Sequence, residues 1–392
     1  MTAATDGTTG RYLVLLEDDW STATQELSRV AGIRAESSVG AEDNRALWEA
    51  EGLVMHELGV AVVSADPDQV TALAQAAGEP GPITLIEPER FVQVVEPAAP
   101  AVEAEAAAVD ESLFTWGLQA TGAPNSTATG KGIKVAVLDT GFDLHHPDFA
   151  GRTVVSSSFV QNEEVQDGHG HGTHCVGTSC GPREVESGPG YGVAYEADIY
   201  VGKVLSNEGA GADGGILTGI NWAITNGCAV VSMSLGAATQ PGQAYSRTFE
   251  RVATRAMAKG TLIIAAAGNE SDRRIGRTNP VGHPANCPSI MSVAAIDVGR
   301  QIAYFSCGTM DTVGAVDLAG PGVDVYSSWP TPLRYKRISG TSMATPHAAG
   351  TAALIAQATG ARGFELWARL SQTGRRLPLP STDVGAGLIQ AP

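Results

Sequence analysis

The sequence predicts an α/β protein built on a doubly wound, mostly parallel sheet and preceded by a small α+β domain. Four short apolar runs alternate with helical stretches, at residues 133–138, 199–205, 229–233 and 262–267. The runs are apolar throughout, as in parallel strands that are buried on both faces. The 47 glycines suit the many tight turns of such a fold. The charge separates the two parts, because residues 1–109 hold 19 acidic and 5 basic side chains of a chain with formal charge −17.

The elements of the first part follow in a strand, helix, two strands, helix, strand order. Residues 11–17 alternate like a strand and residues 21–30 have a helical pattern, while residues 52–64 indicate a hairpin around Gly59. Asp66 and Pro67 supply a cap and a first-turn proline for a helix that includes residues 70–77. Residues 83–95 supply the last strand or strands. This βαββαβ order predicts a ferredoxin-like domain over residues 1–97.

A segment rich in Ala, Pro, Val and Glu, residues 98–109, is typical of a solvated linker that a protease can cut. The larger domain is then expected over residues 110–392. Asp139 and Asn269 both follow apolar runs in it. Reactive groups in α/β sheets gather at these carboxyl ends of strands.

Composition excludes some partners. The excess of acidic residues argues against nucleic acid and anionic membranes as partners. The sequence contains no run of about 18 apolar residues, so no membrane span is predicted. The first twenty residues lack a basic region followed by an apolar stretch. The number of cysteines is five, which is odd and favours reduced thiols; a disulfide between two of them is the alternative. We therefore expect a cytoplasmic protein, with non-classical export left open.

Asp139 ends the run Val-Ala-Val-Leu-Asp-Thr-Gly. A carboxylate at the end of a buried strand is costly unless it is paired or hydrogen-bonded. An aspartic protease needs two such carboxylates that share a proton, and this chain has one Asp-Thr-Gly triplet. A structural, hydrogen-bonded aspartate remains the alternative for this motif alone.

The segment Asp167 to Cys175 holds three histidines. A zinc site is one interpretation, but His171 and His174 are spaced i, i+3 with no Glu between them, unlike the i, i+4 zinc-protease motif. A general base whose tautomer a carboxylate fixes is the favoured interpretation.

Ser342 precedes an Ala- and Gly-rich helix, where amide donors and the helix dipole favour a nucleophile. The segment Gly-Thr-Ser-Met-Ala has Ala where the nucleophile elbow of α/β-hydrolases has its second Gly.

Taken in order, these three segments resemble the subtilase family, in which the triad runs Asp, His, Ser along the chain. The resemblance covers most of residues 115–390 and is nearest in motifs to the proteinase K and subtilisin branches. It implies a subtilisin-like serine endopeptidase with Ser342 as nucleophile, His171 as base and Asp139 as its orienting carboxylate. The segment around Asn269 resembles the oxyanion region, with Asn269 as the side-chain donor beside the Ser342 amide. A catalytically silent subtilase fold that serves as a binding module is the alternative.

The resemblance also outlines a substrate site. Ser234, Leu235 and Gly236 resemble the strand edge on which a peptide or protein substrate pairs, and Gly282 resembles the small residue at the base of the S1 pocket. The loop with Gly211 and Asp213 borders S4. Asp213 stands where relatives carry an aromatic residue, so a polar or basic P4 residue is expected. The same loop matches a GxGxxG pattern, but the acidic residue of a dinucleotide site is missing.

The chemistry requires no cofactor, and calcium is the expected structural ion. Pro288, Ile290 and Asp317 resemble a site of two carbonyls and a carboxylate, with an ordinary acidic turn as the alternative. Asp148 matches one ligand of a second family site whose loop is not recognisable. Cys175 resembles a free cysteine beneath the catalytic histidine, through which mercurials would inhibit.

The first domain resembles the inhibitory propeptide of subtilases, by topology and position. The resemblance implies a monomeric, autoprocessed zymogen whose prodomain is an intramolecular inhibitor, cut between residues 96 and 115. A dedicated maturation protease and a degradative enzyme both remain open.

Overall fold

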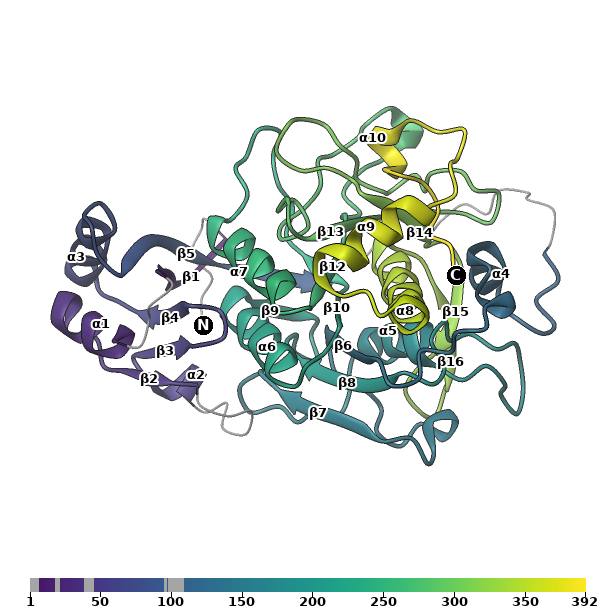
Figure 1. The fold of residues 1–392 in the computed structure, drawn as a ribbon, viewed down its shortest axis with the longest axis horizontal. Helices are drawn as coiled ribbons and strands as arrows, with labels where there is room; N and C mark the ends of the chain where they lie inside the picture. Colours follow the sequence, from purple (N-terminus) through teal and green to yellow (C-terminus); the bar gives the residue numbers. More distant parts are fainter. Residues whose placement is uncertain (1–6, 18–21, 39–45, 95–96, 98–108) are drawn as a thin grey trace.

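A computed structural model describes residues 7–17, 22–38, 46–94, 97 and 109–392. Figure 1 shows a smaller N-terminal domain beside a larger domain, with α6 and α7 between their two sheets. The linker expected at residues 98–109 lies, apart from Val109, outside the described residues.

The larger domain is built on a seven-stranded sheet in the order β14-β13-β12-β10-β6-β8-β7, and each pairing in it is parallel. The predicted α/β class is therefore confirmed. The strands are β6 (Lys134–Asp139), β7 (Val154–Ser158), β8 (Asp198–Lys203), β10 (Val230–Met233), β12 (Leu262–Ala266), β13 (Met291–Ile296) and β14 (Leu318–Pro321). Four of them coincide with the apolar runs seen in the sequence.

Helices cover this sheet, and α8 packs against its middle strands and against α5. The helices are α4 (Trp116–Thr121), α5 (His171–Cys180), α6 (Asp213–Thr225), α7 (Arg247–Ala258), α8 (Thr341–Thr359), α9 (Gly363–Thr373) and α10 (Ser381–Val384). Short 3-10 turns are η1 (Ala123–Asn125), η2 (Pro147–Phe149) and η3 (Arg273–Ile275), and β15 (Val325–Ser328) pairs with β16 (Tyr335–Ile338). No helix among the described residues is long and apolar enough to cross a membrane.

The N-terminal domain has the strand order β5-β1-β4-β3, with β2 at the edge. Its four main strands and two long helices follow the βαββαβ order, whereas β2 and α2 were not expected. Asp66 caps α3 by accepting hydrogen bonds from the amides of Asp68 and Gln69. The elements are β1 (Thr8–Leu16), α1 (Ala23–Ala31), β2 (Ala35–Ser37), α2 (Ala46–Glu49), β3 (Gly52–Met55), β4 (Val60–Ser64), α3 (Pro67–Ala77) and β5 (Ile83–Val94).

The sheet of the N-terminal domain has two buried faces. Along β1, Val14 and Leu16 pack in a core with α1 and α3, whereas Leu13 and Leu15 belong to the core of the larger domain. Alternation of side chains along a strand makes this possible. The second face is therefore an interdomain interface.

Two carboxylates of β5 complete this interface by binding helix N-termini of the larger domain. Glu87 accepts hydrogen bonds from the Ser246 hydroxyl (2.6 Å) and the Arg247 amide (3.0 Å) at the start of α7. Glu89 is fully buried, accepts from the Gly214 amide of α6 at 2.8 Å and pairs with Arg11 at 2.7 Å. Anions at these positions meet unsatisfied amides and the positive end of the helix dipole.

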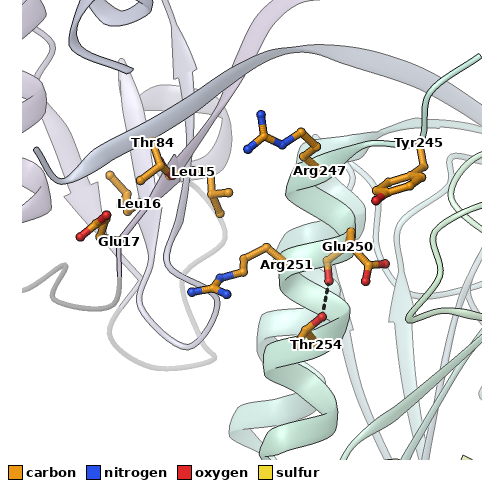
Figure 2. Close-up of a pocket in the computed structure, with 9 residues that line it drawn as sticks. All are labelled: Leu15, Leu16, Glu17, Thr84, Tyr245, Arg247, Glu250, Arg251 and Thr254. Carbon is orange, nitrogen blue, oxygen red and sulfur yellow. Dashed lines mark hydrogen bonds between the residues drawn. The ribbon is translucent and has the colours of Figure 1, made fainter. Parts of the chain in front are cut away.

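One part of the interface is open. A cavity of about 540 Å³ lies between β1 and α7, and Figure 2 shows Arg251 extending from the helix toward the side of Leu15 and Leu16. It is lined by Leu15, Leu16, Glu17, Thr84, Tyr245, Arg247, Glu250, Arg251 and Thr254. None of these is a predicted catalytic residue.

Candidate active site

Asp139 is the last residue of β6 and is fully buried. Its Oδ1 accepts a hydrogen bond from the amide of Thr140 at 2.8 Å and lies 2.8 Å from Nδ1 of His171. These contacts compensate a charge that burial alone would make costly. The carboxylate therefore orients the imidazole.

His171 is the first residue of α5 and is 2% exposed. With Nδ1–H donating to Asp139, Nε2 keeps its lone pair, and this atom is buried without a hydrogen-bond partner among the residues that the structure describes. Burial lowers the pKa of His171, but the charge of Asp139 outweighs it, so that the pKa lies well above 6.5. Nε2 is thus a basic atom available to take a proton.

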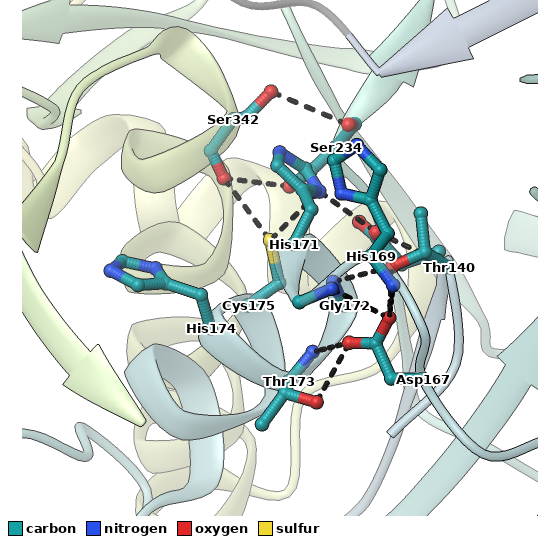
Figure 3. Close-up of polar contacts among 12 residues, drawn as sticks. Thr140, Asp167, His169, His171, Gly172, Thr173, His174, Cys175, Ser234 and Ser342 are labelled. Carbon is teal, nitrogen blue, oxygen red and sulfur yellow. Dashed lines mark hydrogen bonds and ion pairs between the residues drawn. The ribbon is translucent and has the colours of Figure 1, made fainter. Parts of the chain in front are cut away.

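Ser342 lies at the N-terminus of α8, directly after Gly340 and Thr341. Its hydroxyl donates to the carbonyl of Ser234 at 3.3 Å, while the Ser234 hydroxyl donates to the Ser342 carbonyl at 2.7 Å. Figure 3 shows Ser342, Ser234, His171 and Cys175 gathered in one cluster. Nε2 of His171 makes no hydrogen bond to Ser342 among the described residues, and geometry in an unliganded site is often looser than in the complex that reacts.

Asn269 follows β12 and is 3% exposed. Its Oδ1 accepts hydrogen bonds from the amide and the hydroxyl of Thr341, at 2.9 and 2.8 Å. This fixes the amide group with Nδ2 on the opposite side, near Gly340: a Cβ there would lie 3.1 Å from Nδ2 and 3.5 Å from the Ser342 amide nitrogen. Two N–H donors beside Ser342 are the components of an oxyanion hole.

Asp167 was not predicted as a site residue, yet it accepts five hydrogen bonds and holds the start of α5. Its Oδ1 accepts from the Thr140 hydroxyl and from the amides of His169 and Gly170, and its Oδ2 from the amide and hydroxyl of Thr173. The Thr140 hydroxyl in turn accepts from the amide of Gly172 at 2.8 Å. Figure 3 shows how this network joins the segments that carry Asp139 and His171. An Asp-Gly pair just before a helix start was the available signal.

The three histidines of this segment do not converge on one point, which argues against the zinc interpretation. The ring of His174 turns away from the cluster (Figure 3) and donates to the carbonyl of Val325 at 2.9 Å. Burial lowers the pKa of His174 to about 3, so it is neutral. Within the described part of the chain, the one group spaced for a metal is Asp139, His171 and Cys175, and there Asp139 and His171 bond to each other.

Cys175 lies one helical turn after His171, with its sulfur 3.8 Å from Nδ1 and 3.6 Å from the Ser342 carbonyl oxygen. Burial raises its pKa to about 11, so it is a protonated thiol at neutral pH. All five cysteines are buried and free. Cys175 therefore packs beneath the site without being a nucleophile.

The predicted substrate strands already hold a strand of the same chain. The last residues of β5 run antiparallel between β9 (Ala210–Ala212) and β11 (Leu235–Gly236). The amide of Val94 also donates to the carbonyl of Gly209 at 2.8 Å. The paired residues are Phe91 with Ala212, Val92 with Gly211, Gln93 with Ala210 and Gly236, and Val94 with Leu235.

Asp213 and His283, the residue after Gly282, both contact Arg90 of β5. Asp213 is the first residue of α6, accepts the backbone amide of Arg90 and lies 2.9 Å from Nε2 of His283. Gly282 donates its amide to Ala267, and a Cβ at this position would lie 2.9 Å from the carbonyl oxygen of Ala237. Close packing against the backbone thus demands glycine here.

The predicted calcium ligands Pro288, Ile290 and Asp317 flank β13 and β14. Asp317 accepts a hydrogen bond from the Ser292 amide at 2.8 Å, and burial raises its pKa to about 7. A cation such as calcium, bound to this buried carboxylate, would favour its ionised form. Asp148, by contrast, already accepts hydrogen bonds from the hydroxyls of Tyr191 and Tyr335.

Comparison with known proteins agrees with this geometry. The profile of the Subtilase family matches residues 130–373. Subtilisin DY of Bacillus licheniformis is 39% identical over 229 residues, which is 58% of this chain and 77% of that protein. Thermitase of Thermoactinomyces vulgaris is 36% identical over 280 residues, covering 70% of this chain and 94% of thermitase. Subtilisin E of Bacillus subtilis (strain 168) is 41% identical over 230 residues, covering 58% of this chain and 56% of subtilisin E.

Proposed function

The chain belongs to the subtilase family of serine endopeptidases, and from that premise we propose that Ser342, His171 and Asp139 form its catalytic triad. The protein hydrolyses peptide bonds in peptide or protein substrates. In the proposed mechanism, Nε2 of His171 takes the hydroxyl proton while Ser342 Oγ attacks the carbonyl carbon. The acyl-enzyme forms when the protonated His171 gives that proton to the leaving amine. In the second half, His171 takes a proton from water, which attacks the acyl carbon. His171 then returns the proton to Ser342 Oγ, and the carboxylic acid product leaves.

The observation that carries this proposal is the 2.8 Å contact between Asp139 Oδ1 and His171 Nδ1, which leaves Nε2 basic beside Ser342. Asn269 Nδ2 and the Ser342 amide supply the donors for the oxyanion. These act on charge that exists only in the transition state and in the tetrahedral intermediate, which is why such donors accelerate the reaction.

A serine-reactive fluorophosphonate tests the triad. Labelling, located by peptide mapping, is expected on Ser342 alone and is expected to fall by more than 100-fold in His171→Ala. Ser342→Ala is the control for nonspecific reaction. An unlabelled Ser342 in a folded enzyme freed of its N-terminal domain would instead favour the silent binding module.

We further propose that the N-terminal domain keeps the enzyme latent as an intramolecular inhibitor. Support comes from the end of β5, which pairs on both sides with the strands predicted to bind substrate. A substrate cannot add a strand where one already lies. The buried Glu89 and the apolar face of β1 tie the domain to α6 and the core, so that release is slow.

The register of β5 also predicts the processed bond. Val94, the last residue of β5, pairs with Leu235, and the carbonyl of the neighbouring Ser234 accepts the Ser342 hydroxyl. Residues 95 and 96 lie outside the described residues. A chain that kept the register of Val94 would bring the next residue to Ser342, and we therefore expect the cut at the Val95–Glu96 bond. This bond lies one position before the range of residues 96–115 that the resemblance to subtilases implies.

Latency predicts a lag. Freshly folded full chain is expected to hydrolyse a fluorogenic peptide only after a delay, during which a shorter form accumulates on a gel. Hydrolysis at full rate from the first measurement, with the chain still intact, would contradict an inhibitory N-terminal domain.

A further inference from the structure

Asp213 is a fully buried carboxylate that contacts the inhibitory strand directly. Its Oδ2 accepts the backbone amide of Arg90 at 3.0 Å, and its Oδ1 lies 2.9 Å from Nε2 of His283. Arg90 is a neighbour of Phe91 and lies two residues before Val92, which pairs with Gly211. Asp213 therefore contacts β5 two residues before the residue that pairs with Gly211.

The imidazole of His283 lies between the Asp213 carboxylate and the Arg90 side chain. Because Nε2–H donates to Asp213, Nδ1 keeps a lone pair, and this atom lies 3.4 Å from Nη1 of Arg90. The ring of Phe249 packs against His283 with 4.8 Å between centroids, and backbone hydrogen bonds to Ala237 hold the segment from both sides. The imidazole lone pair thus faces the Arg90 guanidinium, while the Asp213 carboxylate holds the other ring nitrogen and the Arg90 backbone amide.

The Arg90 guanidinium and the Asp213 carboxylate belong to different domains. When the N-terminal domain leaves, Arg90 leaves with it, whereas Asp213 and His283 stay on the rim of the substrate groove. What remains is an acceptor nitrogen, Nδ1 of His283, for a basic side chain, and a carboxylate that orients this ring and accepts the backbone amide of an added strand.

We propose that Asp213 and His283 form a subsite for a basic residue, which lies three positions before the substrate residue that pairs with Gly236. This inference rests on the proposed function, because it assumes that substrates add to the groove as β5 does. It moves the expected basic preference from the residue opposite Gly211, as the sequence suggested, to the residue two positions earlier. A charge-assisted hydrogen bond of this kind is worth about a tenfold change in kcat/KM.

Two internally quenched peptides test the subsite. One carries the sequence of residues 89–98, Glu-Arg-Phe-Val-Gln-Val-Val-Glu-Pro-Ala, and the other has Gln in place of the Arg. Quenching across the whole peptide reports a cut at any bond. The enzyme is produced by processing of the full chain, and its active fraction is counted by fluorophosphonate labelling.

We expect the Arg peptide to be cut with a kcat/KM about tenfold higher than the Gln peptide. In Asp213→Asn the ratio should fall to about one, mainly through loss on the Arg peptide. Glu365→Gln, which removes an exposed charge on α9, is the matched control and should keep the tenfold ratio.

A ratio near one in the unmodified enzyme, or an unchanged ratio in Asp213→Asn, would overturn the subsite. So would failure to cut either peptide by an enzyme whose Ser342 is labelled. Absence of labelling would instead overturn the proposed function. If Asp213→Asn does not fold, Arg90→Gln in the full chain leaves the larger domain intact and should shorten the activation lag severalfold; an unchanged lag would contradict the proposal.

Discussion

The amide of Val94 donates to the carbonyl of Gly209 over 2.8 Å, which ties the last strand of the N-terminal domain to the loop before β9 of the larger domain. This hydrogen bond joins residues that are 115 positions apart in the chain. On its other edge, the same residue Val94 pairs with Leu235 of β11. The N-terminal domain is thus joined to the strands that are predicted to bind substrate.

The pH profile should follow the protonation of His171. Only the neutral imidazole can accept the Ser342 proton, and the pKa of His171 lies well above its ordinary 6.5, because the charge of Asp139 outweighs the lowering by burial. Activity of the processed enzyme should therefore rise with pH, with a midpoint above 6.5. Measured kcat/KM on a peptide without ionisable side chains checks this; a midpoint below 6.5 would contradict the assignment.

Asn269→Ala should lower kcat by about 10²–10³ with little change in KM, the range measured for the equivalent kind of donor in a subtilisin. Because Asn269 Oδ1 also bonds to Thr341, thermal unfolding of the variant should be measured in parallel. Equal kcat in Asn269→Ala and in the parent enzyme would remove Asn269 from the oxyanion hole.

Asp167→Asn should damage stability and catalysis together. The substitution replaces an anion that accepts five hydrogen bonds with an amide that has one oxygen. We expect the free energy of unfolding to fall by about 3 kcal/mol, and kcat to fall because the start of α5 carries His171. Urea unfolding in the Ser342→Ala background, where no self-digestion occurs, measures the first effect; a loss below about 0.5 kcal/mol would show that the network is dispensable.

Glu89→Gln should loosen the two domains from each other. The carboxylate is buried, pairs with Arg11 and accepts the Gly214 amide, and removing one partner of a buried ion pair costs about 3 kcal/mol. Hydrogen exchange in the Ser342→Ala full chain should become faster at the first turn of α6. Exposed Glu79 on the same domain is the control, and Glu79→Gln should leave this exchange unchanged.

We also propose that calcium binds at Asp317. Added Ca²⁺ should raise the Tm of the parent chain by several degrees, and should not do so for Asp317→Asn. A thermal shift that persists in Asp317→Asn would place calcium elsewhere, whereas no shift in the parent chain would support the ordinary acidic turn.

The residues of the site were predictable where chemistry follows a local pattern. Asp139 ends an apolar strand, and Ser342 opens a small-residue helix, so each motif can be recognised within a few residues of sequence. The α/β order and the cap at Asp66 were predictable for the same reason.

Contacts between distant segments were not predictable. Glu89 lies 125 residues from the Gly214 amide that it accepts, and nothing near Glu89 in the sequence indicates a buried role. Asp213 was placed at the groove, but its partners Arg90 and His283 come from segments that only the folded chain brings together. Asp167 was visible as part of a motif, yet its five donors were not.

The most direct test of this account compares intact masses and N-terminal sequences of the purified parent chain and of full-chain Ser342→Ala. The parent chain should yield a form that begins at Glu96, whereas Ser342→Ala should keep its full length under the same conditions. The same cut in Ser342→Ala, at the same rate, would show that Ser342 does not carry the reaction and would contradict the account.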